Sequence, residues 1–138
     1  MDKAVAELVP VDIRWPGAWD SIKPYLEEAL DRGSARFWDI QNVYDIAIEG
    51  HIRCWGIILE GRVIGAGVTV EKLFPKAKAL DILLFGMDKH TEQYWLPIHY
   101  KFRDMARAWG YQMLSGEGRP GWAKKLEARQ HYSFEIDL

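Results

Sequence analysis

Three β segments in a row, separated only by tight turns, occupy residues 51–85 of this 138-residue chain. The segments are His51–Leu59, Val63–Leu73 and Ala77–Phe85, with turns at residues 60–62 and 74–76. A glycine or proline turn between apolar, β-branched runs is the usual signal of antiparallel pairing. The sequence therefore predicts a three-stranded meander. The run Ile82–Phe85 is apolar at every position, which indicates a strand buried on both faces.

One strand and two helices are predicted before the meander. Residues Ala4–Arg14 alternate weakly and indicate a strand that Pro10 confines to a sheet edge or a bend. Ala18–Arg32 carries apolar residues at helical spacing. A second helix follows, for which Ser34 is the expected N-cap and Gly50 the stop.

A long helix is predicted after the meander, because Trp95–Trp109 carries an apolar stripe of helical period. Pro97 should kink this helix or mark its first turn. The remaining segments are a strand, a short helix and a last strand, at Tyr111–Ser115, Trp122–Gln130 and Tyr132–Leu138. The order βααβββαβαβ predicts an α/β fold with a mixed sheet and helices on both faces. No linker is visible, so residues 1–138 should form a single domain.

Composition narrows the class of protein. A formal net charge of −2 gives no reason to expect nucleic acid or an acidic membrane as partner. The chain shows neither a signal-peptide pattern nor an apolar run of membrane-spanning length, so a cytoplasmic location is expected. Cys54 is the only cysteine, and the histidines show no ligand spacing, so no metal site is predicted. The 18 aromatic residues either build the core or in part cover a cleft or partner surface.

Residues 83–94, LLFGMDKHTEQY, read as a strand that runs into a helix start. The free N–H groups of a helix start attract anions, and many phosphate sites have this arrangement. Such loops usually carry two or three glycines, whereas this one has only Gly86. The residues alone leave two readings open, a phosphate loop or a simple turn. Residues 116–121 also match GxGxxG, but they follow a very short strand and favour a strand-to-helix turn.

The element order, together with three segments, resembles the GNAT superfamily of N-acetyltransferases. LEGRVIGAGVTV is similar to the family's second hairpin, MARAWGYQML to its third helix and fifth strand, and GRPGWAKKLEARQHYSFEI to its fourth helix and the next strand. The resemblance covers roughly residues 1–138. It implies a mostly antiparallel central sheet and acetyl-CoA-dependent acetylation of a small-molecule or protein amine.

In this family, the loop after the fourth strand has the pattern Arg/Gln-x-x-Gly-x-Gly/Ala and holds the pyrophosphate of acetyl-CoA. The resemblance implies that the cofactor-binding residues here are Phe85, Gly86, Met87, Lys89, His90 and Thr91. The loop would begin at Gly86. It lacks the second glycine, and Asp88 adds a negative charge where the ligand is an anion. We therefore expect weak binding of acetyl-CoA at most.

Acetyl transfer needs a base for the ammonium, a cradle for the carbonyl oxygen and an acid for the thiolate. Glu71 and Asp81, on adjacent predicted strands, are the candidate bases; otherwise they are solvated residues or ion-pair partners. The N–H groups of Phe85 and Gly86 are candidates for polarising the carbonyl, or they simply end a ladder. The family's acid is a tyrosine in the fourth helix. Glu127 stands at that position here, which leaves Tyr132 as the nearby candidate.

A second hypothesis is a GNAT-fold protein without catalysis. The GRPGW turn resembles small GNAT-like proteins encoded in tailed-phage genomes, often near head and tail genes. That resemblance implies a protein that acts in virion assembly, or that binds a phage or host protein through its aromatic surface. Its location would then be the host cytoplasm or the virion.

Overall fold

The computed structural model describes residues 4–117, 122–129 and 135–138. Five strands and four helices follow one another along these residues. They are β1 (Glu7–Val11), α1 (Ala18–Asp31), α2 (Ile40–Ile48), β2 (Arg53–Leu59), β3 (Arg62–Phe74), β4 (Ala77–Met87), α3 (Glu92–Ala108), β5 (Met113–Gly116) and α4 (Trp122–Lys125).

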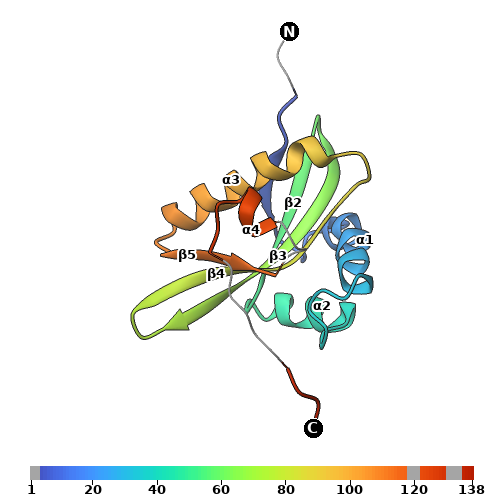
Figure 1. Cartoon of the computed structure of the whole chain (residues 1–138). Helices are drawn as coiled ribbons and strands as arrows, with labels where there is room; N and C mark the ends of the chain where they lie inside the picture. The colour runs from blue at the N-terminus through green and yellow to red at the C-terminus, as the bar shows by residue number, and fades with distance from the viewer. Residues whose placement is uncertain (1–3, 118–121, 130–134) are drawn as a thin grey trace.

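The five strands form one sheet in the order β1-β2-β3-β4-β5 (Figure 1). The first three pairings are antiparallel, and β4 and β5 pair in parallel. The predicted meander and the mixed, mostly antiparallel sheet are confirmed. Pro10 lies in β1, which is an edge strand as its missing N–H requires.

The β2–β3 turn has the geometry of a tight hairpin. Glu60 and Gly61 both have positive φ, 51° and 76°. Two such residues in succession define the turn type whose twist matches that of the flanking strands, and glycine lowers its cost. The turn lies where the sequence predicts it, and β3 begins one residue earlier than expected, at Arg62.

The helix predictions are confirmed except at their ends. α2 begins at Ile40 rather than near Ser34, because Asp39 caps it: the Asp39 side chain accepts from the Asn42 backbone N–H, and the Asn42 side chain accepts from the Asp39 N–H. α3 begins before the predicted Trp95, so Pro97 lies inside it rather than in its first turn.

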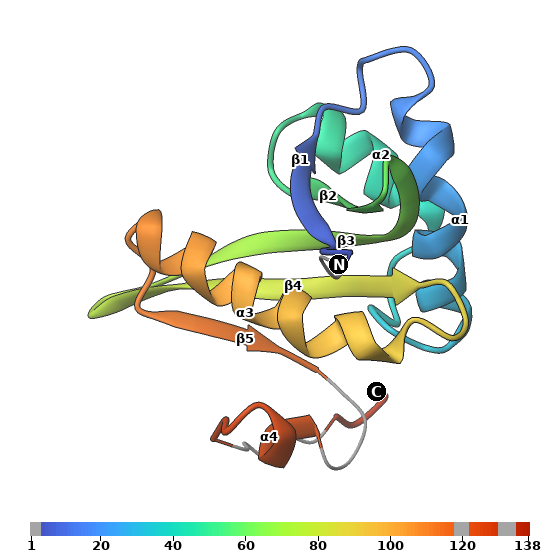
Figure 2. The same cartoon turned by 90° about the horizontal axis from the view of Figure 1, so that it is seen from above.

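The helices cover both faces of the sheet, as expected. α1 and α2 pack on one face, where their apolar residues join β-strand residues such as Val68 and Leu84 in one cluster. α3 lies on the other face (Figure 2). There Ile98 and Phe102 share a second buried cluster with Trp55. Residues 82–85 are buried or half-buried, so both faces of β4 are covered at this point.

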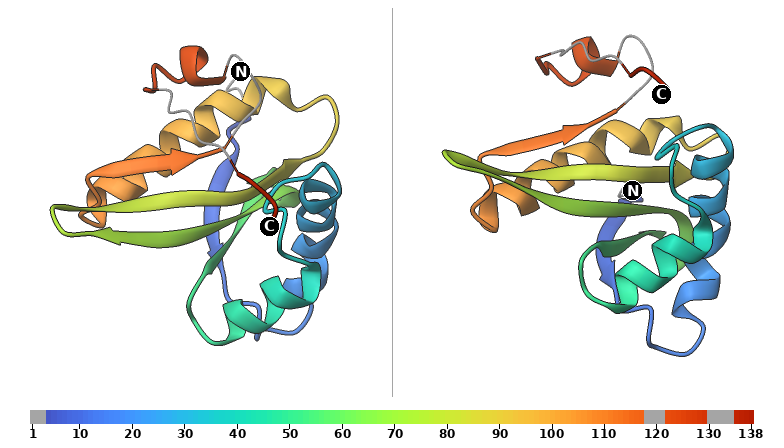
Figure 3. Two further views of the ribbon diagram at one scale, coloured as in Figure 1. Left: turned by 60° about the horizontal axis from the view of Figure 1, so that its bottom comes forward. Right: turned by 90° about the horizontal axis from the view of Figure 1, so that it is seen from below.

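The elements predicted at the C-terminal end differ from those in the structure. α4 is described only from Trp122 to Lys125, shorter than the predicted helix. Of the predicted last strand, residues 132–134 lie outside the described residues, and residues 135–138 form no strand. The chain end instead lies beside the α1–α2 connection (Figure 3), where Arg36 pairs with Glu135 at 3.0 Å and with Asp137 at 2.7 Å. Among the described residues, no helix has the length and apolarity needed to span a membrane.

Candidate active site at the fork of β4 and β5

The parallel strands β4 and β5 separate part of the way along β4. Their pairing runs from Ala79–Met113 to Ile82–Gly116 and stops there among the described residues, while β4 continues to Met87. A bulge at Leu83 coincides with this point, because the β3–β4 register shifts between the residues on either side of it. Figure 2 shows β5 diverging from β4. We call the side of β4 that faces away from β3 beyond this separation, at residues 83–87, the fork.

The register of β3 and β4 decides which backbone groups face the fork. The Asp88 N–H donates to the Ile64 carbonyl oxygen at 2.8 Å. In an antiparallel ladder every second pair of opposed residues is joined by two N–H···O=C bonds. Ile64 and Asp88 form such a pair, so Ala66 and Gly86, two residues along, form the next one. The N–H and C=O of Phe85 therefore point away from β3, toward the fork, and the Gly86 N–H does not.

Gly86 belongs to β4 and not to a loop, which corrects the predicted start of the phosphate loop. The strand is longer than predicted because residues 86 and 87 still pair with β3. A Cβ on Gly86 would lie 2.5 Å from the carbonyl oxygen of Tyr25 in α1. Glycine is needed at this position because the backbone of α1 approaches the strand too closely for a side chain.

The turn between β4 and α3 is residues 88–91, and the helix start behind it has amides without helical acceptors. Thr91 makes no side-chain cap; its hydroxyl donates to the Asp88 carbonyl at 2.5 Å. Tyr94 donates to the Thr91 carbonyl, whereas Glu92 and Gln93 have no acceptor within the helix, as at any helix start. Lys89 and His90 are exposed beside these amides, so the amides and the Lys89 ammonium together present positive charge to solvent.

Asp88 opposes these positive groups. It lies against Tyr25 of α1, whose hydroxyl donates to the Val63 carbonyl at 3.1 Å. Burial raises the pKa of Tyr25 to about 12, and the nearby Asp88 carboxylate raises it further. The Asp88 carboxylate thus lies about one turn before the start of α3, on the side that faces α1.

Asp81 lies where the two strands part. Its carboxylate accepts from the Ser115 hydroxyl of β5 at 2.8 Å and lies 3.4 Å from the Lys72 ammonium. Its side chain is 12% exposed. Ser115 and Lys72 thus fix the position of a nearly buried carboxylate beside the point where β5 leaves β4.

Glu71 lies on the other face of the sheet, so the structure does not bring the two candidate bases together. Val70 pairs with Asp81, and Glu71 pairs with Leu80. Directly opposed residues share a face and successive residues alternate, which separates Glu71 from Asp81. The Glu71 carboxylate accepts from the Tyr111 hydroxyl at 2.5 Å, and this bond raises the pKa of Tyr111. The described residues contain no cluster of three or more metal-ligating side chains.

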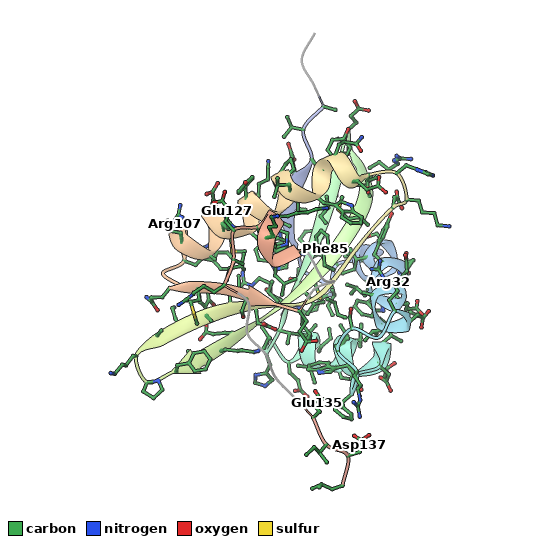
Figure 4. All side chains as sticks on the ribbon, viewed as in Figure 1. Arg32, Phe85, Arg107, Glu127, Glu135 and Asp137 are labelled. Atoms are coloured by element: carbon green, nitrogen blue, oxygen red, sulfur yellow. The ribbon has the colours of Figure 1, made fainter. Side chains whose placement is uncertain are left out.

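Two side chains near Phe85 were not found from the sequence. The Arg32 guanidinium donates to the Phe85 carbonyl at 3.2 Å; both residues are labelled in Figure 4. His99 of α3 lies with its ring 6.3 Å from the Phe85 ring. No local pattern signals either contact, because Arg32 is separated from Phe85 by 53 residues. Burial, and to a smaller extent the charge of Arg103, lower the pKa of His99.

This lowered pKa predicts a pH effect on stability. The unfolded chain takes up a proton at His99 near pH 6.5, before the folded protein does, so the free energy of unfolding should fall as the pH drops from about 7.5 to about 5.5. His99→Gln should flatten this slope in thermal unfolding, because it removes the titrating group. His51→Gln, at a side chain 72% exposed, is the control and should keep the slope. An unchanged slope in His99→Gln contradicts the prediction.

Glu127 stands where the family's tyrosine is expected, and Tyr132 is the candidate acid. Glu127 follows α4 with a left-handed φ of 53° and is exposed (Figure 4). Just after α4, the Leu126 carbonyl accepts from the Arg103 guanidinium of α3. Tyr132 lies outside the described residues.

Comparison with known proteins identifies the fold. No family model matches the sequence, and no curated protein does. Solved structures match over nearly the whole chain. One is an aminoglycoside acetyltransferase from an uncultured soil metagenomic sample, in complex with sisomicin, with 8% identity, a TM-score of 0.69 and 96% of both chains covered.

Two further matches come from named bacteria. A GNAT family acetyltransferase from Staphylococcus aureus is 9% identical, with a TM-score of 0.68 and coverage of 97% of this chain and 98% of that one. A ribosomal-protein-alanine N-acetyltransferase from Brucella melitensis is 10% identical, with a TM-score of 0.66 and coverage of 97% and 99%. At such identities the likeness concerns the fold and not the substrate. The chain has the fold of the GNAT acetyltransferases.

Proposed function

We propose that this protein is a GNAT-like acyltransferase that uses acetyl-CoA to acetylate an amine at the fork. The observation that carries this proposal is the β4 edge at Phe85, with which no strand of the described residues pairs and which leads within a few residues into the start of α3. A free strand edge accepts an extended ligand with amide groups as if it were another strand. A helix start accepts phosphate. The two features lie in the order in which the amide arm and the pyrophosphate occur in CoA.

Each site residue has a role in this proposal. The N–H and C=O of Phe85 bond the amide arm, and Gly86 lets α1 close the wall behind it. Met87, Lys89, His90 and Thr91 line the route to the helix start. Bound acetyl-CoA would supply the acetyl group: its carbonyl carbon would bond the amine nitrogen as the C–S bond broke, and the thiolate would take a proton.

Asp81 is the general base in this proposal, because its carboxylate lies beside the point where β5 leaves β4. It would take the proton that the amine nitrogen loses, either directly or through a water molecule. Glu71 faces the other side of the sheet, so we propose no role for it. The acid is left to Tyr132, on the resemblance alone.

Binding of CoA is the first test. At tenfold excess over the dissociation constant, CoA should stabilise the protein by about 1.4 kcal/mol, roughly 5 °C in a thermal shift. Asp88→Asn should tighten binding about three- to tenfold, because it removes a negative charge near the phosphate position. Asp104→Asn, an exposed change at the far end of α3, is the control and should leave the affinity unchanged. No shift at millimolar CoA would refute the proposal.

Turnover is the second arm of the same test. Asp81→Asn should bind CoA like the wild type but acetylate a panel of amines at least about a hundredfold more slowly. Loss of CoA binding in this variant would instead indicate a structural role for the Asp81–Ser115 bond.

The alternative function is a GNAT-fold protein without catalysis, a phage protein that acts in virion assembly or binds a host factor. The observation that favours it is the surroundings of the cofactor position, where Asp88 opposes an anion and Arg32 covers the Phe85 carbonyl. Leu73 and Phe74, exposed near the tip of the β3–β4 hairpin, would then be candidates for the partner contact. This alternative predicts no CoA binding by the wild type or by Asp88→Asn.

A further inference from the structure

Arg32, at the C-terminal end of α1, supplies a hydrogen-bond donor at the fork. Its guanidinium donates to the Phe85 carbonyl oxygen at 3.2 Å. That oxygen points away from β3, and β5 pairs with β4 only as far as Ile82, so no strand within residues 4–117, 122–129 and 135–138 pairs with β4 at this level. A strand carbonyl without a strand partner needs another donor or water. In the protein as it stands, Arg32 supplies that donor.

The remaining contacts of Arg32 hold it weakly. Its second guanidinium nitrogen lies 4.0 Å from the Glu28 carboxylate, at the limit of an ion pair, and its side chain is 40% exposed. Exposed pairs of this i, i+4 kind contribute little to stability. Arg32 can therefore swing into solvent while the buried residues of α1, Ile22, Leu26 and Ala29, keep their packing.

We propose that Arg32 is a displaceable occupant of the ligand site, one that competes with an incoming amide arm for the Phe85 carbonyl. This inference rests on the proposed function. An amide N–H of the arm takes the place of the guanidinium N–H, while the Phe85 N–H, which points to the same edge, bonds a carbonyl of the arm. This competition lowers the affinity for ligands that carry the arm and does not act on the nucleotide part alone.

The test must separate the effect of the positive charge of Arg32 from its competition for the Phe85 carbonyl. Arg32 is a cation and CoA is an anion, so any arginine removed nearby weakens binding at long range. Arg36→Ala is the matched control. It also removes one exposed arginine, four residues further along the chain, and its contacts are with Glu135 and Asp137 rather than with β4. The comparison that matters is Arg32→Ala against Arg36→Ala.

Calorimetry with two probes, CoA and ADP, tests the proposal on the full chain. Relative to Arg36→Ala, Arg32→Ala should bind CoA about three- to tenfold more tightly, the range that one net hydrogen bond gives, and should bind ADP equally. Equal CoA affinities, or a weaker one in Arg32→Ala, would overturn the competition. A gain that is equal for CoA and ADP would also overturn it, because the arm would not be involved.

The outcomes separate this inference from the function beneath it. If the wild type binds CoA and the two arginine variants bind it equally, the inference fails and the proposed function stands. If the wild type and both variants fail to bind CoA, both fail. Thermal unfolding of each variant, expected to be close to the wild type, shows that a change in affinity does not come from a damaged fold.

Discussion

Gly86→Ala should lower the free energy of unfolding by about 3 kcal/mol, or about 10 °C in melting temperature. The added Cβ would lie 2.5 Å from the carbonyl oxygen of Tyr25 and 3.2 Å from its carbonyl carbon. Both are backbone atoms of α1, so the helix or β4 must move to make room. Chemical denaturation followed by circular dichroism measures the change.

Gly116→Ala is the matched control for this substitution. Its Cβ would lie 3.4 Å from the Ile82 carbonyl oxygen, an ordinary contact, and the change should cost less than about 1 kcal/mol. Equal stability of the two variants would show that α1 does not approach β4 as described. The prediction also matters for function, because a Gly86 variant that loses CoA binding has a displaced α1 and does not by itself reveal a phosphate loop.

Phe102→Ala should have the largest effect on stability, about 4 kcal/mol. The side chain is fully buried in the cluster between α3 and the sheet. Its ring meets Trp55 at 5.9 Å and Phe85 at 6.3 Å, both edge-on. Removing it leaves a cavity under the part of β4 that borders the fork. Urea denaturation measures the loss, and any CoA affinity should fall with it.

Tyr100→Ala on the same helix is the control, because this side chain is 47% exposed. Its ring lies under the Arg103 guanidinium at 5.2 Å, an exposed contact worth less than about 1 kcal/mol. If Phe102→Ala were no more destabilising than Tyr100→Ala, α3 would not pack on the sheet through this face.

Most of the fold follows from local patterns in the sequence. The meander rests on turn residues and β-branched runs a few positions apart, and α1 rests on a helical period of apolar residues. The start of α2 was misplaced although its signal is also local. Asp39 and Asn42 have the spacing of a capping box, and this competes with the weaker cap signal of Ser34.

The relation of Glu71 to Asp81 shows how much one residue of register matters. If the strands ended at Leu73 and restarted at Ala77, as the sequence predicts, Leu73 would pair with Ala77. Glu71 and Asp81 would then lie on the same face of the sheet. The observed strands pair Phe74 with Ala77, which shifts the register by one residue. A shift of one position moves every side chain of one strand to the other face relative to its neighbour. Only Asp81 is therefore left at the fork.

The residues alone predicted the order of elements, the meander and a helix start after β4, because each depends on neighbours within a few positions. They did not predict what surrounds Phe85. A glycine that leaves room for a ligand cannot be told in sequence from one that leaves room for a packed helix. Gly86 leaves room for the backbone of α1. The contact of Arg32 with Phe85 and the parting of β4 from β5 join distant segments, so they arise only when the helices pack on the sheet.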